Sequence, residues 1–211
     1  SPRCTRHGHS GNIDVVTAIK WSCNIFFYDV GRRTTSDVYD AYAYKMGLGT
    51  RTGVEVSEAV GRLTTKNDSN YTASLDIQAA IGQGNTVVTP VQLATYAGTL
   101  ANRGVRYRTH FVKAILDTNT GKVLQETQPE VMDVIEDRGD TFDLVQQGMV
   151  GVAQTIPALA SYPYTIACKT GSPQRSESYY AGSTRKHYTN ATMIAYGPVE
   201  DPQIAIGITI E

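Results

Sequence analysis

Two short stretches of the chain carry residue types that could bind a ligand or take part in chemistry. Lys169-Thr170-Gly171 follows an apolar run and offers a cation, a hydroxyl and a position without a Cβ atom, against which the backbone of a ligand can lie. Ser22-Cys23-Asn24 offers a hydroxyl and a carboxamide much earlier in the chain. Neither stretch is specific alone, because Lys-Thr-Gly also occurs at plain strand-end turns and Ser10-Gly11-Asn12 matches Ser-x-Asn equally well as a helix cap. Order and context must therefore decide their meaning.

Helices are expected on both sides of Ser22-Cys23-Asn24. The spacing of apolar residues, with turn residues between the runs, predicts helices over 13–21, 24–30 and 36–46. Asn12 or Ser10 can cap the first helix, and Gly31 is the expected stop of the second. Ser22-Cys23-Asn24 is therefore expected at a tight turn between the first two helices.

The rest of the chain predicts helices followed by strands. A Thr cap and a Pro at the first helical position begin a helix at Thr89-Pro90 that runs to Asn102. Another helix is expected over 142–152, whereas 51–71 predicts irregular chain. The expected strands are 111–116 and 123–125, joined as a hairpin, and then 164–169, 191–196 and 204–210. This order predicts an α+β fold, an antiparallel sheet flanked by helices.

Both candidate stretches belong to a longer series of segments in a fixed order. The segments are His7-Gly8-His9, 14–19, 22–28, Ile81-Gly82-Gln83-Gly84, 89–94 and 169–174. Together they resemble the transpeptidase domain of class B penicillin-binding proteins, over roughly Arg3 to Glu211, so that 1–211 is interpreted as part of a single domain. The family's motifs are Ser-x-x-Lys, which holds the serine nucleophile, a Ser-x-Asn type triad and Lys-Thr-Gly. The last two are present.

The resemblance implies a peptidoglycan D,D-transpeptidase that cross-links stem peptides and is acylated by β-lactams. Three residues would then be catalytic. Ser22 would belong to the proton path towards the leaving amine, Asn24 would bond the amide of the acyl donor, and Lys169 would supply the positive charge.

The same resemblance assigns the substrate-binding residues. Thr170 and Ser172 would bind the terminal D-alanine carboxylate with their hydroxyls, beside the charge of Lys169, and Gly171 would leave room for the ligand. The backbone N–H of Ser172 would form half of the oxyanion hole, and Pro173 holds that residue extended.

The sequence departs from the family pattern in several places. No Ser-x-x-Lys precedes Ser22, so the chain is expected to begin after the nucleophile motif, and no nucleophile is assigned within it. The one match, Ser183-Thr184-Arg185-Lys186, lies in a polar, Tyr-rich stretch that is interpreted as a rim loop. Ser172 replaces the more usual Thr, and Cys168 replaces a small Gly or Ala. Because the chain also ends at the last strand, the fold is expected to be incomplete at both ends.

Composition excludes several other classes of function. The 211 residues carry a formal net charge of −1, which leaves no basic surface for nucleic acid, and no apolar run approaches the ~20 residues of a membrane span. Cys4, Cys23 and Cys168 form no Cys-x-x-Cys pair, so neither a disulfide scaffold nor a zinc site is indicated, although a Cys4–Cys23 bridge stays open. His7-x-His9 has no further ligands nearby, so no metal or cofactor is expected.

Two other functions fit the same motifs. A β-lactam-sensing receptor would be acylated without turnover, and a D,D-carboxypeptidase would release D-alanine without cross-linking. The residues around Ser22 favour the transpeptidase. The resemblance also implies an extracytoplasmic domain held at the bacterial membrane by an N-terminal anchor, with stem peptides, β-lactams and cell-wall synthesis proteins as partners. Elongation, division and sporulation enzymes fit these residues equally well.

Overall fold

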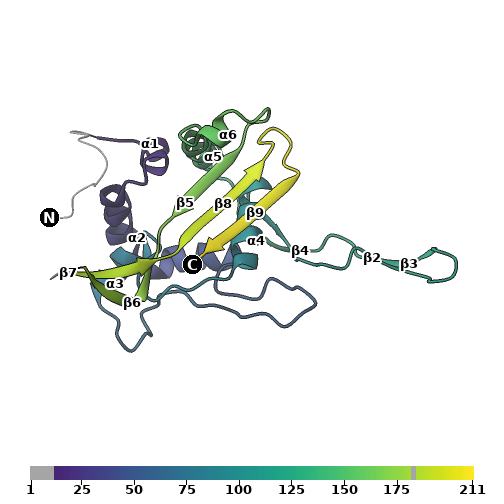
Figure 1. Cartoon of the computed structure of the whole chain (residues 1–211), viewed down its shortest axis with the longest axis horizontal. Helices are drawn as coiled ribbons and strands as arrows, with labels where there is room; N and C mark the ends of the chain where they lie inside the picture. Colours follow the sequence, from purple (N-terminus) through teal and green to yellow (C-terminus); the bar gives the residue numbers. More distant parts are fainter. Residues whose placement is uncertain (1–11, 182–183) are drawn as a thin grey trace.

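A three-stranded antiparallel sheet organises the part of the chain that this computed structural model describes, residues 12–181 and 184–211 (Figure 1). Its strands are β5 (Ala167–Gly171), β8 (Ala191–Gly197) and β9 (Ile204–Ile210), in the order β5-β8-β9. The register pairs Lys169 with Ile194, and Ile194 with Gly207. The three strands predicted near the C-terminus are confirmed, although β5 begins at Ala167 rather than at residue 164.

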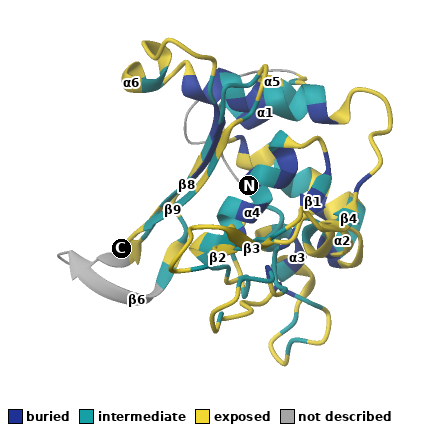
Figure 2. Ribbon diagram, turned by 90° about the vertical axis from the view of Figure 1, so that its right-hand side faces the viewer, coloured by how far each residue is buried: buried dark blue, intermediate teal, exposed yellow. Residues whose placement is uncertain are grey.

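Helices cover one face of this sheet. α4 (Pro90–Ala101) packs against β8 and β9, α5 (Thr141–Ala153) packs against β5, and α1 (Val15–Lys20) packs against α5. In the turned view, all three helices lie on the same side of β8 and β9 (Figure 2). Buried residues of both layers form the main core, among them Ile19, Leu100, Phe142, Met149, Ala167, Ile194 and Tyr196. The fold is therefore α+β, as the sequence predicts.

The start of α4 follows the sequence prediction and also anchors irregular chain. The Thr89 hydroxyl accepts a hydrogen bond from the Gln92 N–H at 3.2 Å, and the Gln92 side-chain oxygen accepts from the Thr89 N–H at 3.0 Å. The Gln92 amide also donates to the carbonyl oxygens of Thr50 at 2.6 Å and Val60 at 2.7 Å. One buried side chain thus ties the helix start to the chain around residues 51–71.

α2 (Asn24–Lys45) runs through the position where the sequence predicts a stop. The stop at Gly31 is wrong, because Gly31 is helical and buried. A Cβ atom there would lie only 2.6 Å from the Cβ of Ala80, so the glycine serves close packing of α2 against the end of α3 (Ala73–Ala79). The break between the two predicted helices lies instead at Thr35, with φ 63° and ψ 162°.

Short elements complete the described chain. The predicted hairpin is confirmed as β2 (Ala114–Leu116) and β3 (Val123–Glu126), which project from the body in Figure 1. Besides the hairpin described next, four short elements were not predicted: α3, α6 (Pro157–Ala160), and the paired strands β1 (Val105–Tyr107) and β4 (Val131–Val134). Each is too short to show a clear hydrophobic period.

The Tyr-rich stretch is a β-hairpin and not a loop. β6 (Gln174–Ala181) pairs antiparallel with β7 (Thr184–Thr189), so the loop predicted around Tyr179, Tyr180 and Tyr188 is wrong. Tyr and Thr favour strands, and that preference prevails over the polar composition. Ser183 lies outside the described residues, and Lys186 lies in β7, an extended strand.

Two buried carboxylates lie between α2 and α3. Asp40 and Asp76 are only 8% and 7% exposed. Tyr71 donates a hydrogen bond to Asp76 Oδ2 at 2.7 Å, whereas Asp76 Oδ1 has no partner within the described part of the chain. Burial raises the pKa of Asp40 to about 6, and the negative charge of Asp76 adds to the rise, followed by Asp37 and Asp68. Ionised Asp40 therefore lowers the stability of the fold at neutral pH.

Asp40→Asn is expected to stabilise the fold at pH 7 by roughly 2 kcal/mol and to leave it almost unchanged near pH 4. In the unfolded chain the Asp40 carboxyl ionises near pH 4, whereas in the folded protein it stays protonated up to about pH 6. The free energy of unfolding of the wild type therefore falls as the pH rises from about 4 to about 6. Urea denaturation at both pH values measures the difference, with the exposed Asp201→Asn as control. Equal stabilisation at both pH values would contradict the effect of burial.

Candidate active site

Two candidate residues that are far apart in sequence meet at the sheet. Lys169 Nζ donates a hydrogen bond to Ser22 Oγ at 2.7 Å, across 147 positions of the chain, and another to the Thr170 carbonyl oxygen at 2.7 Å. A serine hydroxyl that accepts from an ammonium group keeps its own proton for a further acceptor. Ser22 can therefore connect Lys169 with a third group by a proton path.

The backbone of Ser22 has a conformation that is unusual for a residue with a side chain. α1 ends in a Schellman motif, in which the Cys23 N–H donates to the Ala18 carbonyl at 2.9 Å and the Ser22 N–H donates to the Ile19 carbonyl at 3.1 Å. Ser22 occupies the left-handed position of this motif, with φ 52°, where glycine is usual and a side chain costs on the order of 1 kcal/mol. Ser22 therefore departs from the local preference for glycine, as Arg103 does in the same position after α4, also with φ 52°.

Packing of α1 on α5 positions Ser22. Asp14, and not the predicted Asn12, caps α1, with its Oδ1 accepting from the Thr17 N–H at 2.7 Å; Ser10 lies outside the described residues. A Cβ atom at Gly148 would lie 2.7 Å from the Cβ of Ile19, so glycine permits the close approach of α1 to α5. Because α5 also packs against β5, the sheet, α5 and α1 form one continuous support for Ser22 and Lys169.

The other candidate residues lie at the start of α2 and at the end of β5. Asn24 is the first residue of α2, is exposed, and makes no side-chain hydrogen bond to any other described residue. Thr170 and Ser172 are exposed, and Gly171 ends β5 opposite Thr192. Alternation along β5 directs Thr170 to the opposite face from Lys169, whose ammonium group turns to Ser22. The structure brings Ser22 and Lys169 into contact and leaves the hydroxyls of Thr170 and Ser172 free of the core.

One residue near the site was missed by the sequence analysis. Ile81-Gly82-Gln83-Gly84 forms a turn, with φ 75° at Gly82 and 82° at Gly84. The side chain of Gln83 leaves this turn, and its Oε1 accepts a hydrogen bond from the Gln174 N–H at 3.3 Å. Gln174 lies two residues after Ser172. The sequence offered one signal for Gln83, because this residue belongs to one of the segments on which the family resemblance rests.

The cysteines beside the site are buried. Cys23 and Cys168 are free thiols in this structure. Cys168 packs against Val152 and Ala153, and burial raises the pKa of its thiol although Lys169 acts in the opposite direction. Cys4 and His7-x-His9 lie outside the described residues. Over 12–181 and 184–211, no group of three or more His, Cys, Asp or Glu residues could hold a metal ion.

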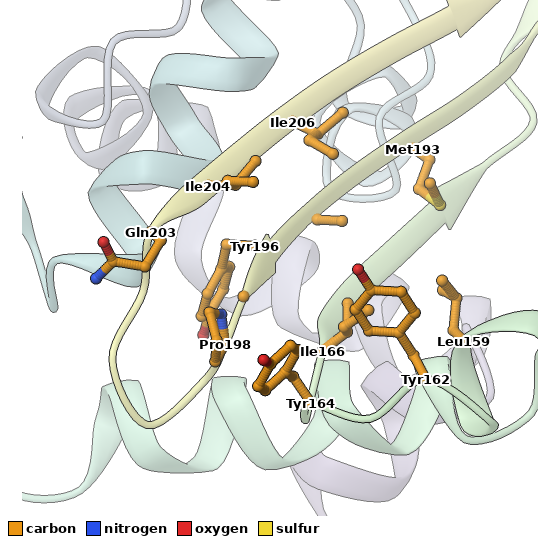
Figure 3. A pocket seen from close by; sticks show the side chains of 12 residues that line it. Leu159, Tyr162, Tyr164, Ile166, Met193, Tyr196, Pro198, Gln203, Ile204 and Ile206 are labelled. Atoms are coloured by element: carbon orange, nitrogen blue, oxygen red, sulfur yellow. The ribbon is translucent and has the colours of Figure 1, made fainter.

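An apolar hollow of about 540 Å³ lies on the other face of the sheet (Figure 3). Tyr162, Tyr164 and Leu159 line one side of it, and residues of β8 and β9 line the other. Its lining residues Met193 and Ala195 alternate with Ile194, the strand partner of Lys169. The hollow and Lys169 therefore lie on opposite faces of the sheet, and the hollow is separate from the candidate site.

Comparison with known proteins identifies the class of protein. The family model for the penicillin binding protein transpeptidase domain matches residues 3–211. Penicillin-binding protein 2A of Bacillus subtilis is 32% identical over 95% of this chain and 31% of its own length. Peptidoglycan D,D-transpeptidase MrdA of Escherichia coli is 27% identical over 97% of this chain and 35% of its own length. The chain therefore belongs to the penicillin-binding protein transpeptidase family.

Solved structures agree with this assignment. Penicillin-binding protein 2B of Streptococcus pneumoniae matches with a TM-score of 0.75 and 27% identity, over 94% of this chain and 35% of that one. An acyl-enzyme complex of penicillin-binding protein A of Mycobacterium tuberculosis has the same fold, with a TM-score of 0.80, 24% identity and coverage of 97% of this chain and 44% of that one. These relatives place the chain in class B. The chain spans about a third of the length of penicillin-binding protein 2A and of MrdA. Among the described residues, no helix has the length and apolar character needed to cross a membrane.

Proposed function

We propose that the protein to which this chain belongs is a peptidoglycan D,D-transpeptidase that is acylated by β-lactams. The observation that carries the proposal is the hydrogen bond from Lys169 Nζ to Ser22 Oγ, because it joins the two motifs expected of this family in one place. Membership in the family supports the same reaction. The enzyme is of the serine type, and its nucleophile is expected outside the motifs present in this chain.

Substrate binding is the first task of the site. A stem peptide that ends in D-alanine presents a carboxylate, and the exposed hydroxyl of Ser172, just beyond the end of β5, can donate to it. The positive charge of Lys169 in β5 strengthens this attraction, whereas the Thr170 side chain lies on the opposite face of the strand from Lys169. The carboxamide of Asn24, at the start of α2, is assigned to the amide of the acyl donor.

Proton transfer is the second task. In acylation, the nucleophilic serine oxygen bonds to the donor carbonyl carbon, and the bond to the terminal D-alanine nitrogen breaks. The nucleophile releases a proton and the leaving amine needs one, and Ser22 can relay the proton to the amine while it receives a hydrogen bond from Lys169. The backbone N–H of Ser172 is assigned to half of the oxyanion hole, which stabilises the negative charge on the carbonyl oxygen during attack.

The cellular setting follows from the same proposal. Cross-linking of stem peptides takes place outside the cytoplasmic membrane, so we place the domain there, held by an anchor elsewhere in the protein. A solved complex joins penicillin-binding protein 2 of Helicobacter pylori to MreC, which supports cell-wall synthesis proteins as partners for this protein as well.

Covalent labelling of the full-length gene product with a fluorescent penicillin tests this function. The proposed enzyme forms an adduct that survives denaturation and is suppressed by excess unlabelled penicillin. It also cross-links stem-peptide substrates in vitro. An adduct without cross-linking or release of D-alanine would identify a β-lactam sensor, and D-alanine release alone would identify a carboxypeptidase.

Ser172→Ala is expected to slow acylation of the full-length protein by about tenfold or less, the scale for the loss of one hydrogen bond. The effect is modest because the positive charge of Lys169 and the backbone N–H of residue 172 are both retained. Stopped-flow measurement of penicillin acylation gives the rate. A loss as large as that caused by removal of Lys169 would contradict the division of roles between these residues.

A further inference from the structure

The segment that follows Lys169-Thr170-Gly171 lies outside the three-stranded sheet. β5 ends at Gly171, and β6 begins at Gln174 as part of a separate two-stranded sheet. The register of β6 against β7 is irregular between Gln174 and Ser178, so the start of β6 is weakly held by its own hairpin. Residues 172–174 are therefore a link between two sheets, although they carry the hydroxyl and the N–H assigned to the substrate.

Two hydrogen bonds hold this link from outside it. The Asn190 N–H donates to the Pro173 carbonyl at 3.0 Å, and this bond comes from the neighbouring end of β7. The Gln174 N–H donates to Gln83 Oε1 at 3.3 Å, and this bond comes from a different part of the fold. Because the partner is a backbone N–H, only the oxygen of the Gln83 carboxamide can accept it.

The turn that carries Gln83 is itself fixed. The Gln83 N–H donates to the Gln78 carbonyl at 3.0 Å, and the Gly82 N–H donates to the Ala79 carbonyl at 2.8 Å, which closes the end of α3. The next residue after the helix, Ala80, packs against Gly31 of α2. The Tyr39 hydroxyl of α2 also donates to the Asp76 carbonyl of α3 at 3.0 Å.

We infer that Gln83 is a positioning residue for acylation, which fixes the Ser172–Gln174 link relative to α2 and thereby aligns the two halves of the candidate site. α2 begins with Asn24, and the link begins with Ser172, so the path from α2 through α3 to Gln83 joins the groups assigned to the donor amide and the oxyanion. This role rests on the proposed function. A group that orients the oxyanion N–H affects the chemical step more than the initial binding of ligand.

Three variants of the full-length protein test the inference. Gln83→Leu removes the acceptor at nearly constant size, Gln83→Glu keeps an acceptor oxygen, and Gln78→Leu makes the same change at an exposed glutamine of α3. In Gln83→Leu we expect hydrogen exchange of the Gln174 amide to become about tenfold faster, on the scale of one lost hydrogen bond. We also expect the acylation rate constant for penicillin to fall about tenfold, while the dissociation constant of the initial complex stays within about twofold. Gln83→Glu and Gln78→Leu should behave as the wild type in both measurements.

The two readouts separate this inference from the proposed function. Unchanged exchange of the Gln174 amide in Gln83→Leu would overturn the inference, because the hydrogen bond would then not hold the link. Faster exchange with a normal acylation rate, or a loss confined to the dissociation constant, would also overturn it. Equal loss in Gln83→Glu and Gln83→Leu would assign a general packing role instead. A wild-type protein that penicillin does not label would refute the proposed function, and with it any role of Gln83 in acylation, while the exchange measurement would still test the bond.

Discussion

Lys169→Ala is expected to slow acylation of the full-length protein by penicillin by on the order of 10²-fold or more, the scale for the loss of one electrostatic contact in a transition state. Two effects act together in this variant. The positive charge near the carboxylate-binding hydroxyl of Ser172 disappears, and Ser22 loses the hydrogen bond that it accepts from Lys169 Nζ at 2.7 Å. Stopped-flow measurement with a fluorescent penicillin gives the acylation rate constant.

Two comparisons make this measurement specific. Lys122→Ala removes a lysine from the exposed turn between β2 and β3 and should leave the acylation rate unchanged. Ser22→Ala should also slow acylation, because it removes the other partner of the same hydrogen bond. Acylation of Lys169→Ala at the wild-type rate would remove both residues from the site.

The 211-residue chain, produced alone, is expected to form no covalent adduct with penicillin. Its residues can bind a carboxylate and move a proton, but none of them is assigned as the attacking atom, and a serine attacks only when a neighbouring base activates it. Ser183-Thr184-Arg185-Lys186 is the one Ser-x-x-Lys sequence present, and its lysine lies in strand β7. Lys186 therefore belongs to an extended segment and not to a helix, which is the element that brings a serine and a lysine three residues apart onto one face.

Incubation with a fluorescent penicillin, followed by denaturing electrophoresis, tests the isolated chain. The full-length protein serves as the positive control, and Ser183→Ala and Ser22→Ala serve as diagnostic variants. An adduct that Ser183→Ala abolishes would make Ser183 the nucleophile. An adduct that Ser22→Ala abolishes would make the Ser22–Lys169 pair a nucleophile and its base instead of a proton path.

Long, periodic elements and their caps could be predicted from the sequence. Thr89 and Pro90 identify the start of α4 because a side-chain cap and a fixed φ act locally. The runs that form β8 and β9 are apolar over most of their length, and their composition alone predicts strands. Gly31 misled the prediction because its small size serves packing against Ala80, a contact that no local pattern shows.

The candidate site was only partly visible in the sequence. Lys169 and Ser22 could be selected as residues that resemble family motifs, but their contact depends on α1, α5 and β5 packing together. The left-handed backbone of Ser22 could not be predicted, because glycine usually occupies that position and a serine gives no local signal for it. Gln83 reaches Gln174 across 91 positions, so a tertiary contact alone places it near the site.

A crystal structure of the full-length protein after reaction with penicillin G tests the central claim most directly. We expect the carboxylate of the bound penicilloyl group within hydrogen-bond distance of the Ser172 hydroxyl. We also expect Lys169 Nζ to remain bonded to Ser22 Oγ, and the Asn24 side chain to contact the amide of the ligand. A penicilloyl group attached to Ser22, or a carboxylate bound away from residues 169–172, would contradict the account.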